Sequence, residues 1–191
     1  RSENCLPDSL ISDLNPPAEG DFSWVEPGTS SWSWWSTSAD EIDYDTMYDY
    51  IDYAQETGQK YCLIDFGWEV WEDYETKIRD LAAYAEPKGV GLLLWYGVNK
   101  FDRPHKFDLD NPETIEQEFA WCEELGVKGV KVDYINSDSQ FAMKVMYDLA
   151  SIAAKHKQVL NYHGSTDPNG ENRTFPNILS SEAVKGSEYF K

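Results

Sequence analysis

The sequence predicts an α/β fold of the (β/α)8 barrel type, of which the chain contains about the first six strand–helix units. Short apolar segments alternate with amphipathic ones, and most of the apolar segments start roughly 30 residues apart. Four of the six apolar segments lack polar alternation, which is typical of parallel strands covered on both faces. No GxGxxG loop follows the first strand, and this favours a barrel over the competing open, doubly wound sheet.

The six strands are expected at residues 31–35, 60–66, 90–96, 129–134, 158–162 and 177–181. A complete barrel takes about 250 residues, so we expect its last two units to be missing from these 191 residues. Residues 1–30 contain prolines and glycines and little periodicity, and they predict a linker leading from a missing upstream domain. Residues 31–191 are then the incomplete catalytic barrel.

Four helices are expected between the strands, three of them with a capping residue at the start. The expected caps are Asp45 or Thr46, Asn111 followed by Pro112, and Asp138 or Ser139, and the remaining helix is expected from Tyr74 to Ala85. The side chains expected to face the core are Met47, Ile51, Ala54, Ile78, Leu81, Ala82, Ala85, Ile115, Phe119, Cys122, Leu125, Phe141, Val145, Leu149 and Ile152.

The charge balance limits the partners of the protein. Thirty-five acidic residues face 16 basic ones, a formal charge of −19, which disfavours nucleic acid and anionic membranes. An acidic chain with 15% aromatic residues suits neutral, hydroxyl-rich ligands and hard cations. The three cysteines, Cys5, Cys62 and Cys122, are far apart and indicate neither a zinc site nor a disulfide scaffold.

Polar and aromatic residues gather where the expected strands end, which is where a barrel carries its active site. These residues are Trp34, Trp35, Asp65, Trp68, Trp95, Lys131, Asp133, His163, Glu182 and Glu188. Sugar faces stack on aromatic rings, and two carboxyl groups flank the bond that a glycosidase cleaves. The pattern therefore favours glycoside hydrolysis.

Individual residues keep alternative interpretations at this point. Asp133 could be a nucleophile, since Lys131 lies on the same face of the strand and a nearby ammonium group favours a charged carboxylate. The alternative is that it is a helix cap or a structural partner of Lys131. Asp65 is suited to a substrate hydroxyl or to a structural hydrogen bond, and His163 to the site or the core. By spacing alone Glu182 and Glu188 resemble a surface pair.

Several segments resemble glycoside hydrolase family 97. They are SDLNPP at 12–17, SWSWW at 31–35, YIDYA at 50–54, IDFGW at 64–68, GVKGVKVD at 126–133, NYHG at 161–164, RTFPNIL at 173–179 and EAVKGSE at 182–188. The resemblance runs in order along nearly the whole chain. It implies an exo-acting α-glycosidase with a β-sandwich before the barrel and a smaller β domain after it, in a periplasmic or secreted bacterial protein.

The same resemblance implies a retaining mechanism and roles for the residues. Inverting members carry a glutamate base where this chain has Gly164 and lack an aspartate at Asp133, so the chain is similar to the retaining, α-galactosidase-like branch. Asp133 would be the nucleophile and Glu188 the acid/base, with carboxyl groups about 5–5.5 Å apart. Glu182 would bind a calcium ion, with other ligands outside this chain. The sugar would contact Trp34, Trp35, Asp65, Trp68, Trp95, Lys131 and His163.

Three alternatives remain open. An inverting α-glucosidase of the same family would need a glutamate at position 164. A catalytically silent carbohydrate-binding domain would use the tryptophans without Asp133. An open-sheet protein unrelated to sugars would leave Trp34, Trp68 and Trp95 dispersed.

Overall fold

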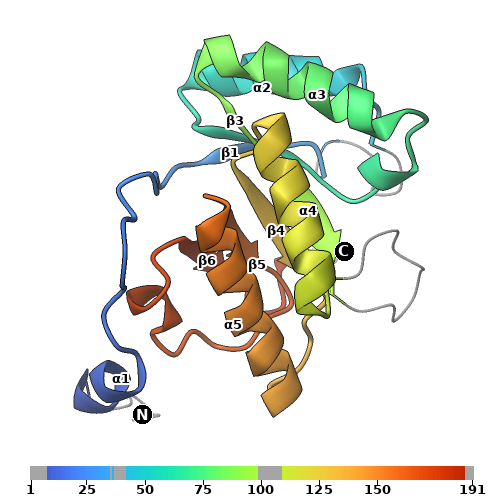
Figure 1. The fold of residues 1–191 in the computed structure, drawn as a ribbon. Helices are drawn as coiled ribbons and strands as arrows, with labels where there is room; N and C mark the ends of the chain where they lie inside the picture. The colour runs from blue at the N-terminus through green and yellow to red at the C-terminus, as the bar shows by residue number, and fades with distance from the viewer. Residues whose placement is uncertain (1–7, 35, 37–41, 99–108, 188–191) are drawn as a thin grey trace.

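The fold is a curled half-barrel of six parallel strands, as predicted from the sequence (Figure 1). The computed structural model describes residues 8–34, 36, 42–98 and 109–187. The strands are β1 (Ser30–Trp32), β2 (Tyr61–Ile64), β3 (Gly91–Gly97), β4 (Gly129–Asp133), β5 (Val159–Tyr162) and β6 (Ile178–Ser181). They pair in the order β1-β2-β3-β4-β5-β6 without reversal, which is the order of a barrel and not of a doubly wound sheet.

The helices connect consecutive strands and lie along the outer side of the curved sheet (Figure 1). They are α2 (Thr46–Thr57), α3 (Tyr74–Ala85), α4 (Pro112–Leu125) and α5 (Gln140–Lys155), with short 3-10 turns η1 (Trp68–Val70), η2 (Glu86–Lys88) and η3 (Glu171–Arg173). Gly58 and Gly126 end α2 and α4 in the left-handed conformation, with φ of 70° and 80°. Glycine adopts this conformation with little steric strain, and the chain then turns out of the helix toward the next strand.

The capping predictions hold for two helices and fail for one. Asn111 Oδ1 accepts a hydrogen bond from Thr114 N at 3.0 Å, and Ser139 Oγ accepts one from Ala142 N at 3.2 Å. The side chain of Asp45 makes no cap, because its backbone is already helical. Asp43 takes that role, with Oδ2 accepting from Thr46 N at 2.9 Å.

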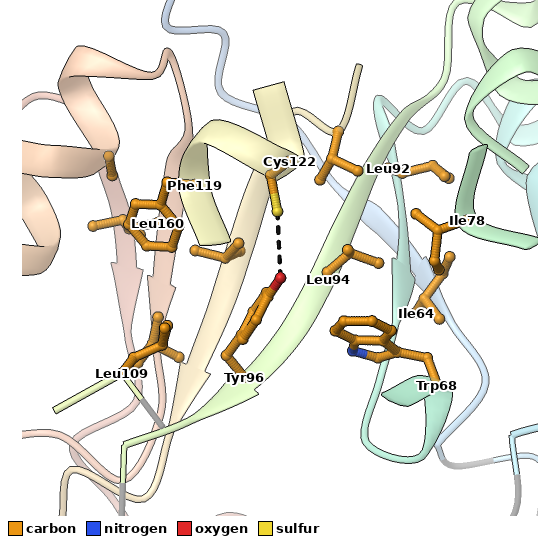
Figure 2. Packing of buried hydrophobic residues seen from close by; sticks show 14 of the residues in the cluster. Ile64, Trp68, Ile78, Leu92, Leu94, Tyr96, Leu109, Phe119, Cys122 and Leu160 are labelled. Carbon is orange, nitrogen blue, oxygen red and sulfur yellow. Dashed lines mark hydrogen bonds between the residues drawn. The ribbon is translucent and has the colours of Figure 1, made fainter. Parts of the chain in front are cut away.

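Most of the core lies between the sheet and the helices. Figure 2 shows Leu92, Leu94 and Tyr96 of β3 packing outward against helical side chains such as Phe119 and Ile78. Nearly all the side chains predicted to face the core are buried there, and the buried Cys62 and Cys122 are free thiols.

The predicted inward face of α5 was partly wrong. Phe141 is 59% exposed, whereas its neighbour Ala142 is buried. The buried stripe of α5 consists of Ala142, Val145, Met146, Leu149, Ala150 and Ala153. Three of these six residues are alanines, so the bulk of an apolar residue was a poor guide to the direction of its side chain.

The segment before the barrel contains a short helix, α1 (Asp8–Leu14), which the sequence did not indicate. Asn15, which follows it, is buried, and its Nδ2 donates to Asn169 O at 2.8 Å. The segment is therefore attached to the β5–β6 connection, although its role as a linker from another domain stays a prediction. Within the residues that the structure describes, no helix is both long and apolar enough to cross a membrane.

Candidate active site

The candidate site lies on the inner face of the sheet, at the ends of its strands. Successive side chains of a strand point to opposite faces, so Val130 and Val132 of β4 join the outer core while Lys131 and Asp133 point inward. A pocket of about 340 Å³ opens here. The inward-facing residues that line it are Trp32, Asp65, Trp95, Lys131, Asp133 and His163.

The buried end of the pocket is a charged pair. Lys131 Nζ lies 2.9 Å from Asp65 Oδ2, and their side chains are 4% and 1% exposed. Trp32 Nε1 donates to the same oxygen at 2.6 Å, and Phe66 N donates to Asp65 Oδ1 at 2.7 Å. Asp65 is therefore held by three donors, which fits the structural interpretation of this residue and fixes the floor of the pocket.

Lys131 also joins the floor to two aromatic rings and to Asp133. Its ammonium lies 4.9 Å from the centre of the Trp32 ring and 6.0 Å from that of Trp34, and the two rings stack with an interplanar angle of 5°. The distance from Lys131 Nζ to Asp133 Oδ2 is 3.5 Å. Lys131 thus pairs more closely with Asp65 than with Asp133.

Asp133 has a carboxylate that is fixed in direction and still reachable. Trp95 Nε1 donates to Oδ2 at 3.1 Å, and the backbone N–H of Tyr134 donates to Oδ1 at 2.8 Å. The Asp133 side chain is 18% exposed and lines the pocket. A partly exposed carboxylate held by donors on both oxygens is arranged to contact a ligand in a defined orientation.

His163 and Glu182 form the opposite wall. His163 Nδ1 lies 3.2 Å from Glu182 Oε2, and Gly164 N donates to the same oxygen at 3.4 Å. Burial lowers the pKa of His163 below its ordinary 6.5, and the Lys131 ammonium lowers it further against the opposing effect of nearby carboxylates. The imidazole is therefore neutral at neutral pH.

Four lining residues were not predicted as site residues from the sequence: Trp32, Phe66, Tyr134 and Asn136. The last two, Tyr134 and Asn136, have left-handed backbones, with φ of 62° and 43°. Non-glycine residues adopt this conformation rarely and at a cost, often near functional sites. The only sequence signal was their position directly after Asp133, in the loop that leaves β4.

The other predicted site residues have different outcomes. Trp34 lines the pocket. Trp68 does not: its side chain is fully buried in the outer core (Figure 2). Its Nε1 donates to Trp95 O at 2.8 Å, and its ring stacks on that of Trp121. It has no free surface for a sugar, so its predicted role was wrong. Trp35 and Glu188 lie outside the described residues.

The described residues contain no cluster of acidic side chains suited to calcium. Calcium takes six to eight oxygen ligands. In the described part of the chain, no three His, Cys, Asp or Glu side chains are grouped so that they could hold a metal ion. One oxygen of Glu182 already faces His163 and Gly164, so Glu182 could provide only a single ligand in a set completed elsewhere.

Comparison with known proteins identifies a family that the chain matches over most of its length. The family model described as glycoside hydrolase 97 matches residues 24–184. A retaining alpha-galactosidase of Bacteroides thetaiotaomicron is 36% identical over 92% of this chain, and a probable retaining alpha-galactosidase of Streptomyces bingchenggensis is 35% identical over 94%. The chain spans only 27% and 29% of these two relatives.

A solved structure is similar as well. The crystal structure of a beta-arabinopyranosidase superposes with a TM-score of 0.84 and is 33% identical, covering 96% of this chain and 30% of its own. The likeness extends over the whole half-barrel, including the strands whose ends form the pocket.

Proposed function

This chain belongs to glycoside hydrolase family 97, and we propose that the full-length protein is a retaining α-galactosidase with Asp133 as nucleophile and Glu188 as general acid/base. The orientation of Asp133 carries the proposal. Its carboxylate faces the pocket, and it is fixed by Trp95 Nε1 at 3.1 Å and the Tyr134 N–H at 2.8 Å. The relatives called retaining alpha-galactosidases support the substrate class.

The reaction would proceed by double displacement. An oxygen of Asp133 attacks the anomeric carbon and forms a glycosyl–enzyme ester, while Glu188 gives its proton to the departing glycosidic oxygen. Glu188 then takes a proton from water, the water oxygen attacks the same carbon, and the ester bond breaks to return Asp133 as a carboxylate. Two inversions leave the product with the anomeric configuration of the substrate.

Gly164 supports retention over the inverting alternative. An inverting enzyme would need a glutamate at this position. The Gly164 backbone has φ of +53°, and a Cβ built on it would lie 2.5 Å from Asn136 Oδ1. A side chain there would have a strained backbone and would have to displace the Asn136 amide, so this wall is not built to hold a base.

A second substrate has a specific observation in its favour, the likeness to a beta-arabinopyranosidase. In the L-series, a β-arabinopyranoside presents the same ring hydroxyls as an α-galactopyranoside and lacks only the hydroxymethyl group. The same pocket floor and the same nucleophile would serve both substrates.

Calcium binding through Glu182 and a periplasmic or secreted location remain proposals that rest on the family resemblance. No catalytic step above depends on either. Glu182 would take part as one of several ligands, and the rest would come from outside the described residues.

The test uses the full-length protein with aryl α-galactoside, α-glucoside and β-L-arabinopyranoside, and follows the first-formed anomer by NMR. We expect turnover of the galactoside with retained configuration. Asp133→Gly should reduce turnover on the order of 10³-fold or more, as expected for loss of a nucleophile. Azide should restore activity by occupying the vacated space, and the glycosyl azide should have the opposite configuration.

Asp138→Gly is the matched control, since Asp138 is an exposed carboxylate of the same loop outside the pocket. It should keep wild-type turnover. An inverted product from the wild type would overturn the proposed mechanism. Sugar binding without turnover in either the wild type or Asp133→Gly would instead favour a binding domain.

A further inference from the structure

The exposure of the pocket residues increases in one direction along the site. Asp65 and Lys131 are 1% and 4% exposed, and Asp133 is 18% exposed. Tyr134 is 41% exposed, and Asn136 is also exposed. The pocket thus has a buried end at the charged pair and an outer end at Tyr134 and Asn136, with Asp133 between them.

The outer end is held firmly although it belongs to a loop. Ile135, between the two residues, is 1% exposed and part of the core. The backbone N–H of Asn136 donates to Gly164 O, which joins this loop to the one that follows β5. The Tyr134 ring meets the Trp95 ring edge to face, with centroids 6.0 Å apart. The left-handed backbones on either side of Ile135 are therefore kept in place by tertiary contacts.

The carboxamide of Asn136 occupies the space that a side chain at Gly164 would need. A Cβ at Gly164 would lie 2.5 Å from Asn136 Oδ1 and 3.4 Å from its Cγ. The position of this amide group and the absence of a side chain at Gly164 are consequently coupled. The amide is exposed at the pocket rim, where it can donate to or accept from a hydroxyl group.

We propose that Tyr134 and Asn136 form the subsite for the leaving group, and that this group is a neutral sugar. The inference rests on the proposed function: a terminal sugar bound at the buried end, with its anomeric carbon at Asp133, directs the glycosidic oxygen toward the outer end. There the Tyr134 ring offers a face for stacking, and Asn136 offers both kinds of hydrogen-bonding group.

The test compares two substrates that share the terminal sugar and differ in the leaving group. In the full-length protein, kcat/KM is measured for α-galactosyl fluoride, whose fluoride is too small to reach the rim, and for an α-galactosyl disaccharide. Asn136→Gly removes the amide and tolerates the left-handed backbone. We expect it to lower kcat/KM for the disaccharide by roughly five- to tenfold, the effect of one lost hydrogen bond, and to leave the fluoride within about twofold.

A second variant displaces the amide instead of deleting it. Gly164→Ala should lower the disaccharide-to-fluoride ratio of kcat/KM in the same direction. The double variant Gly164→Ala/Asn136→Gly should have the ratio of Asn136→Gly alone, because both changes act on one group. Asn172→Gly, at an exposed asparagine outside the pocket, is the matched control and should leave the ratio unchanged.

The outcomes separate this inference from the proposed function. Equal losses on both substrates in Asn136→Gly would overturn the leaving-group subsite while an α-galactosidase remains. A wild-type protein that hydrolyses neither substrate would overturn the proposed function itself. A selective loss on the disaccharide supports both.

Discussion

Replacing Lys131 by methionine should destabilise the protein far more than replacing a surface lysine. Lys131 Nζ lies 2.9 Å from Asp65 Oδ2 in a pair that is almost completely buried. An effective dielectric constant of about 20 gives a gross attraction of roughly 6 kcal/mol at that distance. Desolvation offsets most of it, yet removal of one partner of a buried pair costs about 3–5 kcal/mol, because the other charge is left uncompensated.

The expected cost of Lys131→Met is at the lower end, about 3 kcal/mol. Asp65 keeps its hydrogen bonds from Trp32 Nε1 and Phe66 N, which still stabilise the carboxylate. The measurement is a urea titration of the full-length protein followed by tryptophan fluorescence. The double variant with Asp65→Asn leaves no unpaired charge at Asp65, so we expect a coupling energy of at least about 2 kcal/mol between the two positions.

Lys144→Met is the matched control for this prediction. Lys144 pairs with Asp148 one helical turn away, and its side chain is 65% exposed. Such pairs contribute about 0.3–0.5 kcal/mol. If Lys131→Met proved as mild as Lys144→Met, or if its effect added fully to that of Asp65→Asn, the reasoning about a buried charged floor would be refuted.

Three further predictions address the pH dependence and the packing. The pKa of His163 is lower in the folded protein than in the unfolded chain. As the pH falls, His163 therefore becomes protonated in the unfolded chain before it does so in the folded protein. The contribution of His163 to the free energy of unfolding is therefore complete above about pH 6.5 and is lost as the pH falls through the folded-state pKa. His163→Gln should flatten this part of the curve of stability against pH, and a curve identical to that of the wild type would contradict the prediction. Gly129→Ala should cost at least about 2 kcal/mol, since its Cβ would lie 2.3 Å from the carbonyl oxygen of Val159; a melting temperature equal to that of the wild type would exclude this clash. Leu149→Ala should cost about 2–5 kcal/mol and Phe141→Ala less than about 0.5 kcal/mol, because only Leu149 is buried. If Phe141 faced the core as the sequence predicted, calorimetry would instead show a cost of several kcal/mol for both variants.

The sequence predicted the strands and helices well because each carried a local signal. The apolar runs that became β2 to β5 are covered on both faces, and the period of 3.6 residues identified the buried side of α3 and α4. The position of Lys131 and Asp133 on one face also followed from strand periodicity alone. Their contact at 3.5 Å confirmed it.

The site residues that were wrongly predicted or missed have a common feature. The position of each depends on packing between segments that are distant in the sequence. Trp68 follows a strand end, where site residues are expected, but the η1 turn directs its ring to Trp121 of α4. Asn136 contacts Gly164 across two connecting loops. No pattern within one segment contains information on such pairs, so the rim of the pocket could not be identified before the fold was known.

Strand β4 shows how the fold fixes the position of the proposed nucleophile. Val130 and Val132 are 1% or less exposed and belong to the outer core, while Lys131 and Asp133 between and after them face the pocket. A slip of one residue in register would turn both charged groups into the apolar layer and both valines toward the pocket. The cost of burying those charges without partners would be several kcal/mol. The apolar half of the strand therefore determines the register, and the register determines where Asp133 meets Trp95 and Lys131. In β4 the valines stabilise the core, and the alternate residues Lys131 and Asp133 form the site. For this reason a buried strand can carry charged groups that face a pocket.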